Sequence, residues 1–262
     1  MTYRVALHGS GILADAIGVQ ILERADLELV TDDADCVLVA PDPRDTQAES
    51  TILELLAAGR NVATTADLRT DQDTLLDSCR RGGSTLYRTG FAQFLIQRFV
   101  LTATQGMSSI RHIRFVESRS ADPVEPPPRT ETYRPAIESV ARELYAAEAA
   151  AVRIVSDFEQ LSDRVTLTER AYLDDHHFLT LEAIRYPAAG PGAPAAYTLR
   201  IDGDPSDLVM QWEIEPNDDS DVLAVGCAHV LLDAVGAICE AEAGLLIDNP
   251  DPHYQHDDRV HR

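Results

Sequence analysis

Near its start the chain reads Tyr3-Arg4-Val5-Ala6-Leu7-His8-Gly9-Ser10-Gly11-Ile12-Leu13-Ala14, a short apolar run that ends in the pattern Gly-x-Gly-x-x-Ala. Apolar residues at helical spacing follow at once, so the stretch predicts a strand, a tight turn and a helix. Gly9 permits the turn, Gly11 lets the backbone approach a pyrophosphate, and Ala14 lets the helix pack on the strand. We therefore predict that Gly9, Ser10, Gly11 and Ile12 bind the diphosphate of a dinucleotide at the start of the helix. A plain turn between a strand and a helix is the alternative.

The length, composition and net charge limit the kinds of protein that this chain can be. The chain has 262 residues, 45% of them hydrophobic, which is enough for one or two domains with a substantial core. No run approaches the ~18 consecutive apolar residues of a membrane span, and no secretory leader pattern is present, so we expect a soluble, cytoplasmic protein. The net charge is −22, and every basic residue is arginine. This charge disfavours nucleic acid and anionic membranes as partners, and the missing lysine excludes Schiff-base chemistry.

The sequence predicts neither a metal site nor a disulfide. The four cysteines show no paired metal-ligand spacing, so we expect reduced, buried thiols. His253, His256 and Asp257 have the chemistry to bind zinc or nickel. They lie in the acidic segment 248–262, for which a flexible tail is the interpretation we favour.

Residues 1–107 alternate between strand and helix patterns, which predicts a Rossmann-like parallel sheet with helices on both faces. One conflict arises early. The apolar runs Leu27–Val30 and Cys36–Ala40 are only five residues apart, whereas parallel neighbours need a crossover of a dozen or more. Either Leu27–Val30 pairs antiparallel at an edge, or a crossover unit is missing. Asp32 lies about 20 residues past the glycine turn, where an acidic residue would bind the adenosine ribose; a turn aspartate is the other interpretation.

Residues 108–247 predict a second, α+β domain built on a largely antiparallel sheet. Ile110–Ser118 alternates, Glu138 to about Gln160 predicts a long helix, and Asp221–Ala243 predicts a final apolar helix. Between these helices, short turns separate four expected strands, namely Arg164–Leu173, Phe178–Tyr186, Ala196–Ile201 and Leu208–Ile214. The fold class is thus α/β at the N-terminus and α+β at the C-terminus.

Five stretches carry a resemblance to the dihydrodipicolinate reductase superfamily, in particular to the branch typified by 2,4-diaminopentanoate dehydrogenase. They are Val5–Ala14, Asp35–Pro41, Leu56–Thr65, Cys79–Gly90 and Ile201–Pro205. The resemblance covers most of the chain. It implies an NAD or NADP cofactor and hydride transfer to or from a small amino or imino acid or a related carbonyl compound. It also implies a homodimer or homotetramer, because the open face of the second sheet often meets another subunit in this superfamily.

The resemblance assigns further residues to the cofactor. It places Pro41 beside the cofactor and Thr64 and Thr65 near the nicotinamide ribose. The sequence departs from the family pattern where Ala66 replaces a glycine and where Phe91-Ala92-Gln93 replaces Asn-Pro-Gly. The family also usually has a further strand–helix stretch between Val30 and Thr31, which this chain lacks. A catalytically degenerate nucleotide-binding or scaffold protein is therefore the rival interpretation, which this shortened first domain and the missing lysine favour.

A hydride transfer also needs a substrate clamp and a group that exchanges a proton. The resemblance places Thr89 and Gly90 at the substrate, and Arg88 and Arg98 flank this pair with guanidinium groups suited to a carboxylate. The predicted catalytic candidates are His176, His177 and Glu117. Surface charges and turn histidines are the alternatives. His176-His177 lacks the lysine that follows the reductases' His-His pair, so the family's catalysis is not transferred to it.

Overall fold

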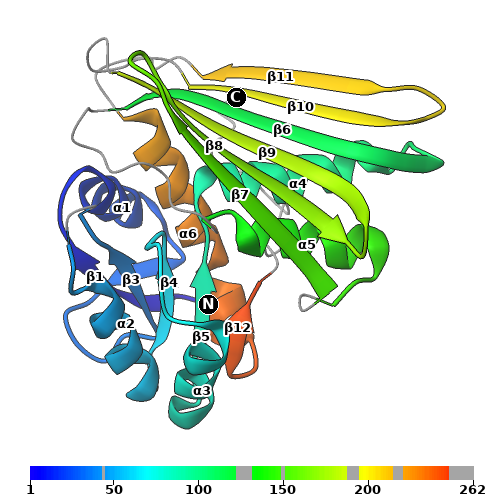
Figure 1. Cartoon of the computed structure of the whole chain (residues 1–262). Helices are drawn as coiled ribbons and strands as arrows, with labels where there is room; N and C mark the ends of the chain where they lie inside the picture. Colours follow the sequence, from blue (N-terminus) through cyan, green and yellow to red (C-terminus); the bar gives the residue numbers. More distant parts are fainter. Residues whose placement is uncertain (43–44, 122–131, 149–150, 188–194, 215–220, 248–262) are drawn as a thin grey trace.

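Two six-stranded sheets form the molecule, and the computed structural model describes residues 1–42, 45–121, 132–148, 151–187, 195–214 and 221–247 (Figure 1). The first, sheet A, is parallel throughout. The second, sheet B, is mixed and largely antiparallel. The predicted fold class is therefore confirmed.

Sheet A contains, in spatial order, β12 (Gly244–Leu246), β5 (Thr85–Arg88), β4 (Asn61–Thr64), β3 (Cys36–Ala40), β1 (Tyr3–Gly9) and β2 (Leu27–Leu29). All five residues of β3 are buried, because helices cover both faces of the sheet. On one face α1 (Ile12–Glu23) and α6 (Val222–Glu240) pack on Val5 and Leu38. On the other face α2 (Ala48–Ala57) and α3 (Gln72–Gly82) pack on Val37 and Val62.

The pairing of β2 resolves the conflict in the sequence. β2 runs parallel to β1, so antiparallel pairing at an edge was the wrong alternative. Leu29 of β2 and Cys36 of β3 are both in register with Val5, on opposite sides of β1. β2 therefore pairs with the first part of β1 and β3 with the last part. Because the two strands are staggered along β1, the chain does not have to travel back along the sheet, and no crossover helix is needed.

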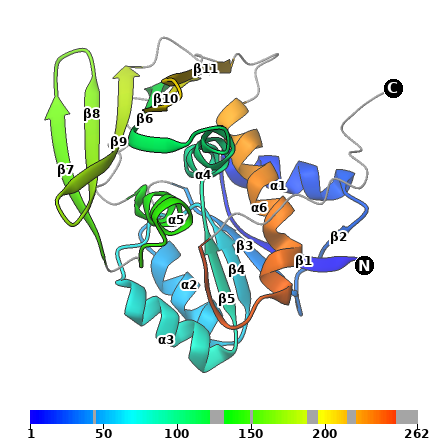
Figure 2. The same cartoon turned by 90° about the vertical axis from the view of Figure 1, so that its right-hand side faces the viewer.

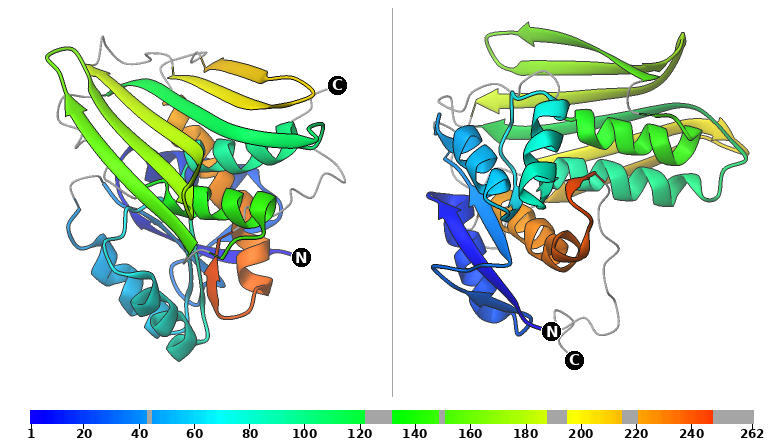
Figure 3. Two further views of the ribbon diagram at one scale, coloured as in Figure 1. Left: turned by 45° about the vertical axis from the view of Figure 1, so that its right-hand side comes forward. Right: turned by 90° about the horizontal axis from the view of Figure 1, so that it is seen from below.

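Sheet B contains, in spatial order, β11 (Leu208–Ile214), β10 (Ala195–Asp204), β6 (Ser109–Ala121), β9 (His176–Pro187), β8 (Val165–Leu173) and β7 (Val152–Gln160). One face is apolar and lies under α4 (Phe91–Thr104) and α5 (Arg134–Tyr145), which separate it from sheet A (Figures 2 and 3). The other face is open and mixed in polarity. Ion pairs such as Arg114 with Glu182 lie on it.

One expectation for the second half of the chain was wrong. The long helix expected over residues 138–160 ends at Tyr145, and Val152–Gln160 forms β7 instead. In addition, α6 and β12 pack on sheet A, although the division at residue 107 assigned them to the second domain. Sheet A is thus completed by residues from both ends of the described chain.

Helix α6 is long and strongly apolar. It has 19 residues and a mean hydropathy of 2.1 over its most apolar window, so its length and composition would suffice to span a membrane. In this structure Leu231, Val235 and Ile238 are fully buried against sheet A and α1. These contacts are those of a core helix.

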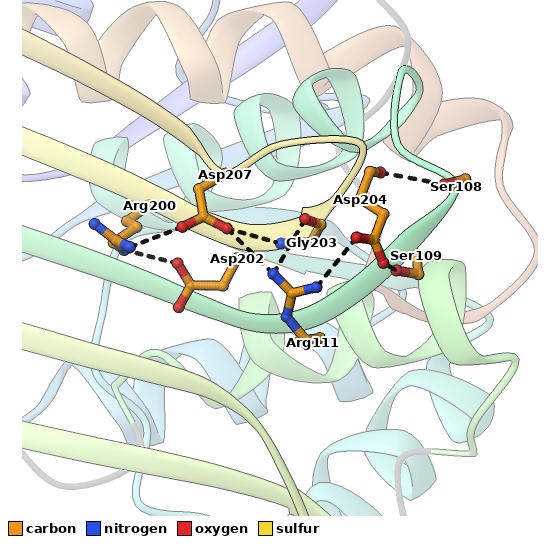
Figure 4. Close-up of polar contacts among 8 residues, drawn as sticks. All are labelled: Ser108, Ser109, Arg111, Arg200, Asp202, Gly203, Asp204 and Asp207. Atoms are coloured by element: carbon orange, nitrogen blue, oxygen red, sulfur yellow. Dashed lines mark hydrogen bonds and ion pairs between the residues drawn. The ribbon is translucent and has the colours of Figure 1, made fainter.

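Charged side chains fix the hairpin between β10 and β11 to the start of β6 (Figure 4). Arg111 donates to the carbonyl oxygen of Gly203 at 3.1 Å and to Asp207 Oδ1 at 3.3 Å. Arg200 donates to Asp202 at 2.7 Å and to Asp207 at 3.0 Å. The ladder between β10 and β6 shifts register at Asp202 and Gly203, so these contacts hold an irregular strand end in place.

Candidate active site

The glycine turn between β1 and α1 is open. Gly9, Ser10, Gly11 and Ile12 are all exposed, so the start of α1 is accessible to solvent. Gly9 has a φ of 143°, and a Cβ there would lie 1.9 Å from the carbonyl oxygen of Ala40 on β3. Gly11 has a φ of 89° and caps α1 without a side-chain hydrogen bond. The first N–H groups of α1 are therefore available to an anion.

The end of β3 lies beside this turn. Gly9 is in register with Ala40, which brings the next residue, Pro41, to the position that the resemblance implies. A Cβ on Gly11 would lie 3.8 Å from Asp42 Oδ2 and would otherwise meet open space. The space in front of α1 is thus open, and Asp42 places a carboxylate at its border.

Asp32 is not brought to the turn. Its carbonyl oxygen accepts a hydrogen bond from Arg4 at 3.3 Å, and its neighbour Asp33 forms an ion pair with the same arginine at 2.8 Å. Arg4 precedes Gly9 by five residues, roughly 16 Å along a strand. Asp32 therefore lies at the amino-terminal half of sheet A, because β2 ends level with Val5.

The carboxyl ends of β4 and β5 border a small hollow that is open to solvent. Thr65, Arg88 and Thr89 line it, together with residues that begin α4 and precede or begin α5. Thr64 fixes this edge, because its hydroxyl donates to the carbonyl oxygen of Val39 at 2.7 Å and its carbonyl oxygen accepts from Thr89 N at 3.1 Å. Four predicted residues, Thr64, Thr65, Arg88 and Thr89, are thus brought together, and Gly90 follows directly.

Arg98 is not among the residues that line the hollow. It lies on α4 two turns beyond Gly90, about 12 Å along the helix axis. The structure therefore separates the two arginines that were expected to clamp a substrate, and Arg88 is the one at the hollow.

Glu117 lies on the covered face of sheet B in a buried polar cluster. Tyr133, which precedes α5, donates its hydroxyl hydrogen to Glu117 Oε2, and Arg185 Nη2 lies 3.1 Å from the same oxygen. Arg119 Nε lies 3.6 Å from Glu117 Oε1. Burial opposes ionisation of Glu117, but the charges of Arg185 and Arg119 outweigh it and hold the pKa below its usual value. Glu117 is therefore an ionised carboxylate in the protein interior.

Tyr197 on β10 completes this group, which we call the Glu117 cluster: Glu117, Arg119, Tyr133, Arg185 and Tyr197. Tyr197 is directly opposite Glu117 in the β6–β10 ladder, and Arg119 is directly opposite Arg185 in the β6–β9 ladder. The ring of Tyr197 meets the ring of Phe91 edge-on at 6.1 Å. Phe91 follows Thr89 and Gly90, and Tyr133 follows Thr132, which lines the hollow; the cluster residues themselves do not line it.

Four members of the Glu117 cluster were not predicted from the sequence, namely Arg119, Tyr133, Arg185 and Tyr197. They are far apart along the chain and share no motif. One signal was available for this region: Glu117 and Arg119 continue the inward alternation of Ile113 and Phe115 on β6. Charged residues at inward strand positions indicate a buried polar cluster, because buried charges need polar partners.

The structure does not bring His176 and His177 to the hollow. His177 lies on the open face of sheet B, where its Nε2 and that of His112 both lie 3.0 Å from the hydroxyl of Thr180. His176 is exposed at the β8–β9 turn. Burial and, for His112, the nearby His177 lower the pKa values of this histidine pair. Glu117 is on the opposite face, so neither turn histidine approaches it.

The cysteines and the possible metal ligands were also located in the structure. All four cysteines are free thiols. Among the residues that the structure describes, no group of three or more histidine, cysteine or acidic side chains is arranged to hold a metal ion. His253, His256 and Asp257 lie outside the described residues.

Comparisons with known proteins show the fold. No family model and no curated protein sequence matches the chain. An amine dehydrogenase from Mycobacterium smegmatis is similar over 97% of this chain and 98% of its own, with a TM-score of 0.71 and 12% identity. A dipicolinate-bound dihydrodipicolinate reductase from Paenisporosarcina also matches, over 94% and 97%, with a TM-score of 0.52 and 11% identity. So does a Synechocystis biliverdin reductase solved with biliverdin and NADP+, over 90% and 91%, with a TM-score of 0.54 and 12% identity. The chain has the fold of Rossmann-type dehydrogenases.

Proposed function

We propose that the protein is an NAD(P)-dependent oxidoreductase that transfers a hydride to or from a small amino or imino acid or a related carbonyl compound. The observation that carries the proposal is the open glycine turn at the carboxyl edge of sheet A, beside Pro41 and on the same edge as the hollow at Thr65 and Thr89. In doubly wound sheets this edge is where ligands bind. The names of the similar structures, an amine dehydrogenase, a dihydrodipicolinate reductase and a biliverdin reductase solved with NADP+, support the same chemistry.

The residues of the turn fit a dinucleotide. Gly9 and Gly11 adopt backbone conformations that side chains rarely allow, and a Cβ on Gly11 would occupy the space in front of α1. When bound, a nicotinamide dinucleotide supplies the hydride acceptor or donor. In the proposal, the first N–H groups of α1 hold the diphosphate, while Pro41, Thr64 and Thr65 border the nicotinamide end.

The substrate side is formed by Arg88, Thr89 and Gly90, with Glu117 behind them. Glu117 Oε2 is engaged by Tyr133 and Arg185, and Oε1 lies 3.6 Å from Arg119 Nε. In the proposal, a substrate nitrogen reaches Glu117 at Oε1, beside Arg119. Because the pKa of Glu117 is lowered, this carboxylate binds and orients a cationic nitrogen better than it retains a proton.

A turnover experiment tests the proposal. The full chain is incubated with NAD+ or NADP+ and a panel of small amino acids and amines, and in the reverse direction with ammonium, oxo acids and the reduced cofactor. We expect a change in nicotinamide absorbance for at least one substrate, and loss of that change in Glu117→Gln. Cofactor binding by calorimetry is measured on the same samples.

The rival, a nucleotide-binding protein without chemistry, has its own support in the structure. Asp42 places a carboxylate beside the proposed diphosphate site, and Asp32 is remote from it. Cofactor binding without turnover on any member of the panel would favour this rival. No cofactor binding at all would contradict both functions.

A further inference from the structure

Strand β2 ends before it reaches the level of the glycine turn. It is in register with β1 only from Tyr3 to Val5, whereas β1 pairs with β3 from Val5 to Gly9. Gly9 lies four residues beyond Val5, about 13 Å along a strand. The end of β2 is therefore in the amino-terminal half of sheet A, and the proposed diphosphate site is at the carboxyl edge.

The acidic loop after β2 is held in that half of the sheet by hydrogen bonds. Asp35 bonds to both backbone groups of Arg4, since its side chain accepts from Arg4 N at 2.7 Å and its N–H donates to the carbonyl oxygen of Arg4 at 2.7 Å. The Arg4 side chain pairs with Asp33 at 2.8 Å and donates to the carbonyl oxygen of Asp32 at 3.3 Å. Asn61 at the start of β4 donates to the carbonyl oxygen of Asp35 at 3.0 Å. The loop would have to break these bonds to approach the glycine turn.

This placement affects the choice between NAD and NADP. In dinucleotide-binding folds an acidic residue after the second strand bonds to the adenosine ribose, or an arginine there accommodates the 2′-phosphate of NADP. The two arginines of residues 1–42 are both in ion pairs, Arg4 with Asp33 and Arg24 with Asp26. Asp42 does lie beside the turn, but it follows β3, on the other side of β1 from β2. Within the described residues 1–42, neither device is therefore placed where β2 would present it.

We propose that the protein binds its nicotinamide cofactor without recognising the adenosine group, so that NADH, NADPH and a dinucleotide with another purine base bind alike. This inference rests on the proposed function and specifies the cofactor selectivity of that site. The affinity then comes from the diphosphate at α1 and from the nicotinamide end. His8 and Gly9 at the end of β1 are exposed, as expected where β2 does not extend alongside them.

The test is a calorimetric titration of the full chain with NADH, NADPH and reduced nicotinamide guanine dinucleotide. It is performed at about 0.5 M salt, where screening keeps the net charge of −22 from disfavouring the extra phosphate of NADPH. Asp32→Asn and Asp33→Asn are titrated in the same way. Asp163→Asn is the charge-matched control, because Asp163 is exposed between β7 and β8 on the other sheet. Melting temperatures show that each variant is folded.

We expect the dissociation constants of the three cofactors to agree within about fivefold in the wild type, and their ratios to be unchanged in all three variants. A wild type that prefers one of the three cofactors by more than this would overturn the inference. So would ratios that change in Asp32→Asn or Asp33→Asn but not in Asp163→Asn, because the loop after β2 would then contact the adenosine. In both cases a cofactor still binds, so the proposed function survives. If none of the three binds, the proposed function itself fails, and the inference fails with it.

Discussion

Glu117 and Tyr197 face each other across β6 and β10 on the covered face of sheet B, one as an ionised carboxylate and the other as an unpartnered hydroxyl. The rest of that face is apolar and packs against α4 and α5. A buried ion pair contributes little net stability compared with apolar packing of the same volume. The ion pair of Glu117 with Arg185 is therefore not explained by stability alone.

Replacing Glu117 with glutamine leaves Arg185 without its carboxylate partner in the interior. We expect the free energy of unfolding at pH 7 to fall by about 3–5 kcal/mol. Because the pKa of Glu117 is lowered in the folded state, its stabilising contribution is present above the unfolded value of 4.5 and is lost as the pH falls below it. The difference between wild type and variant in urea denaturation should thus shrink toward low pH. A difference that stays constant with pH would show that Glu117 is neutral in the fold.

Asp42 is expected to weaken cofactor binding through its charge. Asp42→Asn removes a carboxylate beside Gly11 and should tighten NADH binding about 2- to 5-fold at low salt, with a smaller gain at high salt. Asp32→Asn is the matched control, because Asp32 lies near Arg4 and should leave the affinity unchanged. Weaker binding by Asp42→Asn would mean that this carboxylate contacts a ribose hydroxyl instead.

The histidine pair on the open face of sheet B predicts a second pH dependence. Burial lowers the pKa values of His112 and His177 in the folded state, so the unfolded chain takes up protons first as the pH falls. Their stabilising contribution is complete above about 6.5 and is lost below it. The melting temperature should decline as the pH falls below this value. A double variant with asparagine at both positions should show a shallower decline, and an identical decline would exclude the pair as its cause.

The parts of the fold that depend on local periodicity were predictable. β1, β3 and the four later strands of sheet B follow from apolar runs and alternation, and the glycine turn follows from its spacing. The helix prediction over residues 138–160 was wrong because an alanine-rich stretch hid the alternation of Val152 and Ile154. The parallel pairing of β2 depends on its stagger against β1, which no local pattern encodes.

The candidate site was predictable only where it follows one strand edge. Thr64, Thr65 and Thr89 end neighbouring strands, and the parallel order brings them together. Tyr133, Arg185 and Tyr197 meet Glu117 through strand register and helix packing, so their proximity is visible only in three dimensions. His177 was a candidate because of its residue type, but the strand alternation directs it to the opposite face from Glu117.

Calorimetric titration of NADH and NADPH into the wild type, Gly11→Asp and Gly106→Asp tests the central claim most directly. Gly11→Asp fills the space in front of α1 with a carboxylate, whereas Gly106→Asp adds the same group at a glycine with open surroundings beyond α4. We predict that the wild type and Gly106→Asp bind at least one of the two cofactors, and that Gly11→Asp binds it at least about tenfold more weakly. Equal affinity in all three proteins, or no binding to the wild type, would contradict the assignment of this turn as a dinucleotide site.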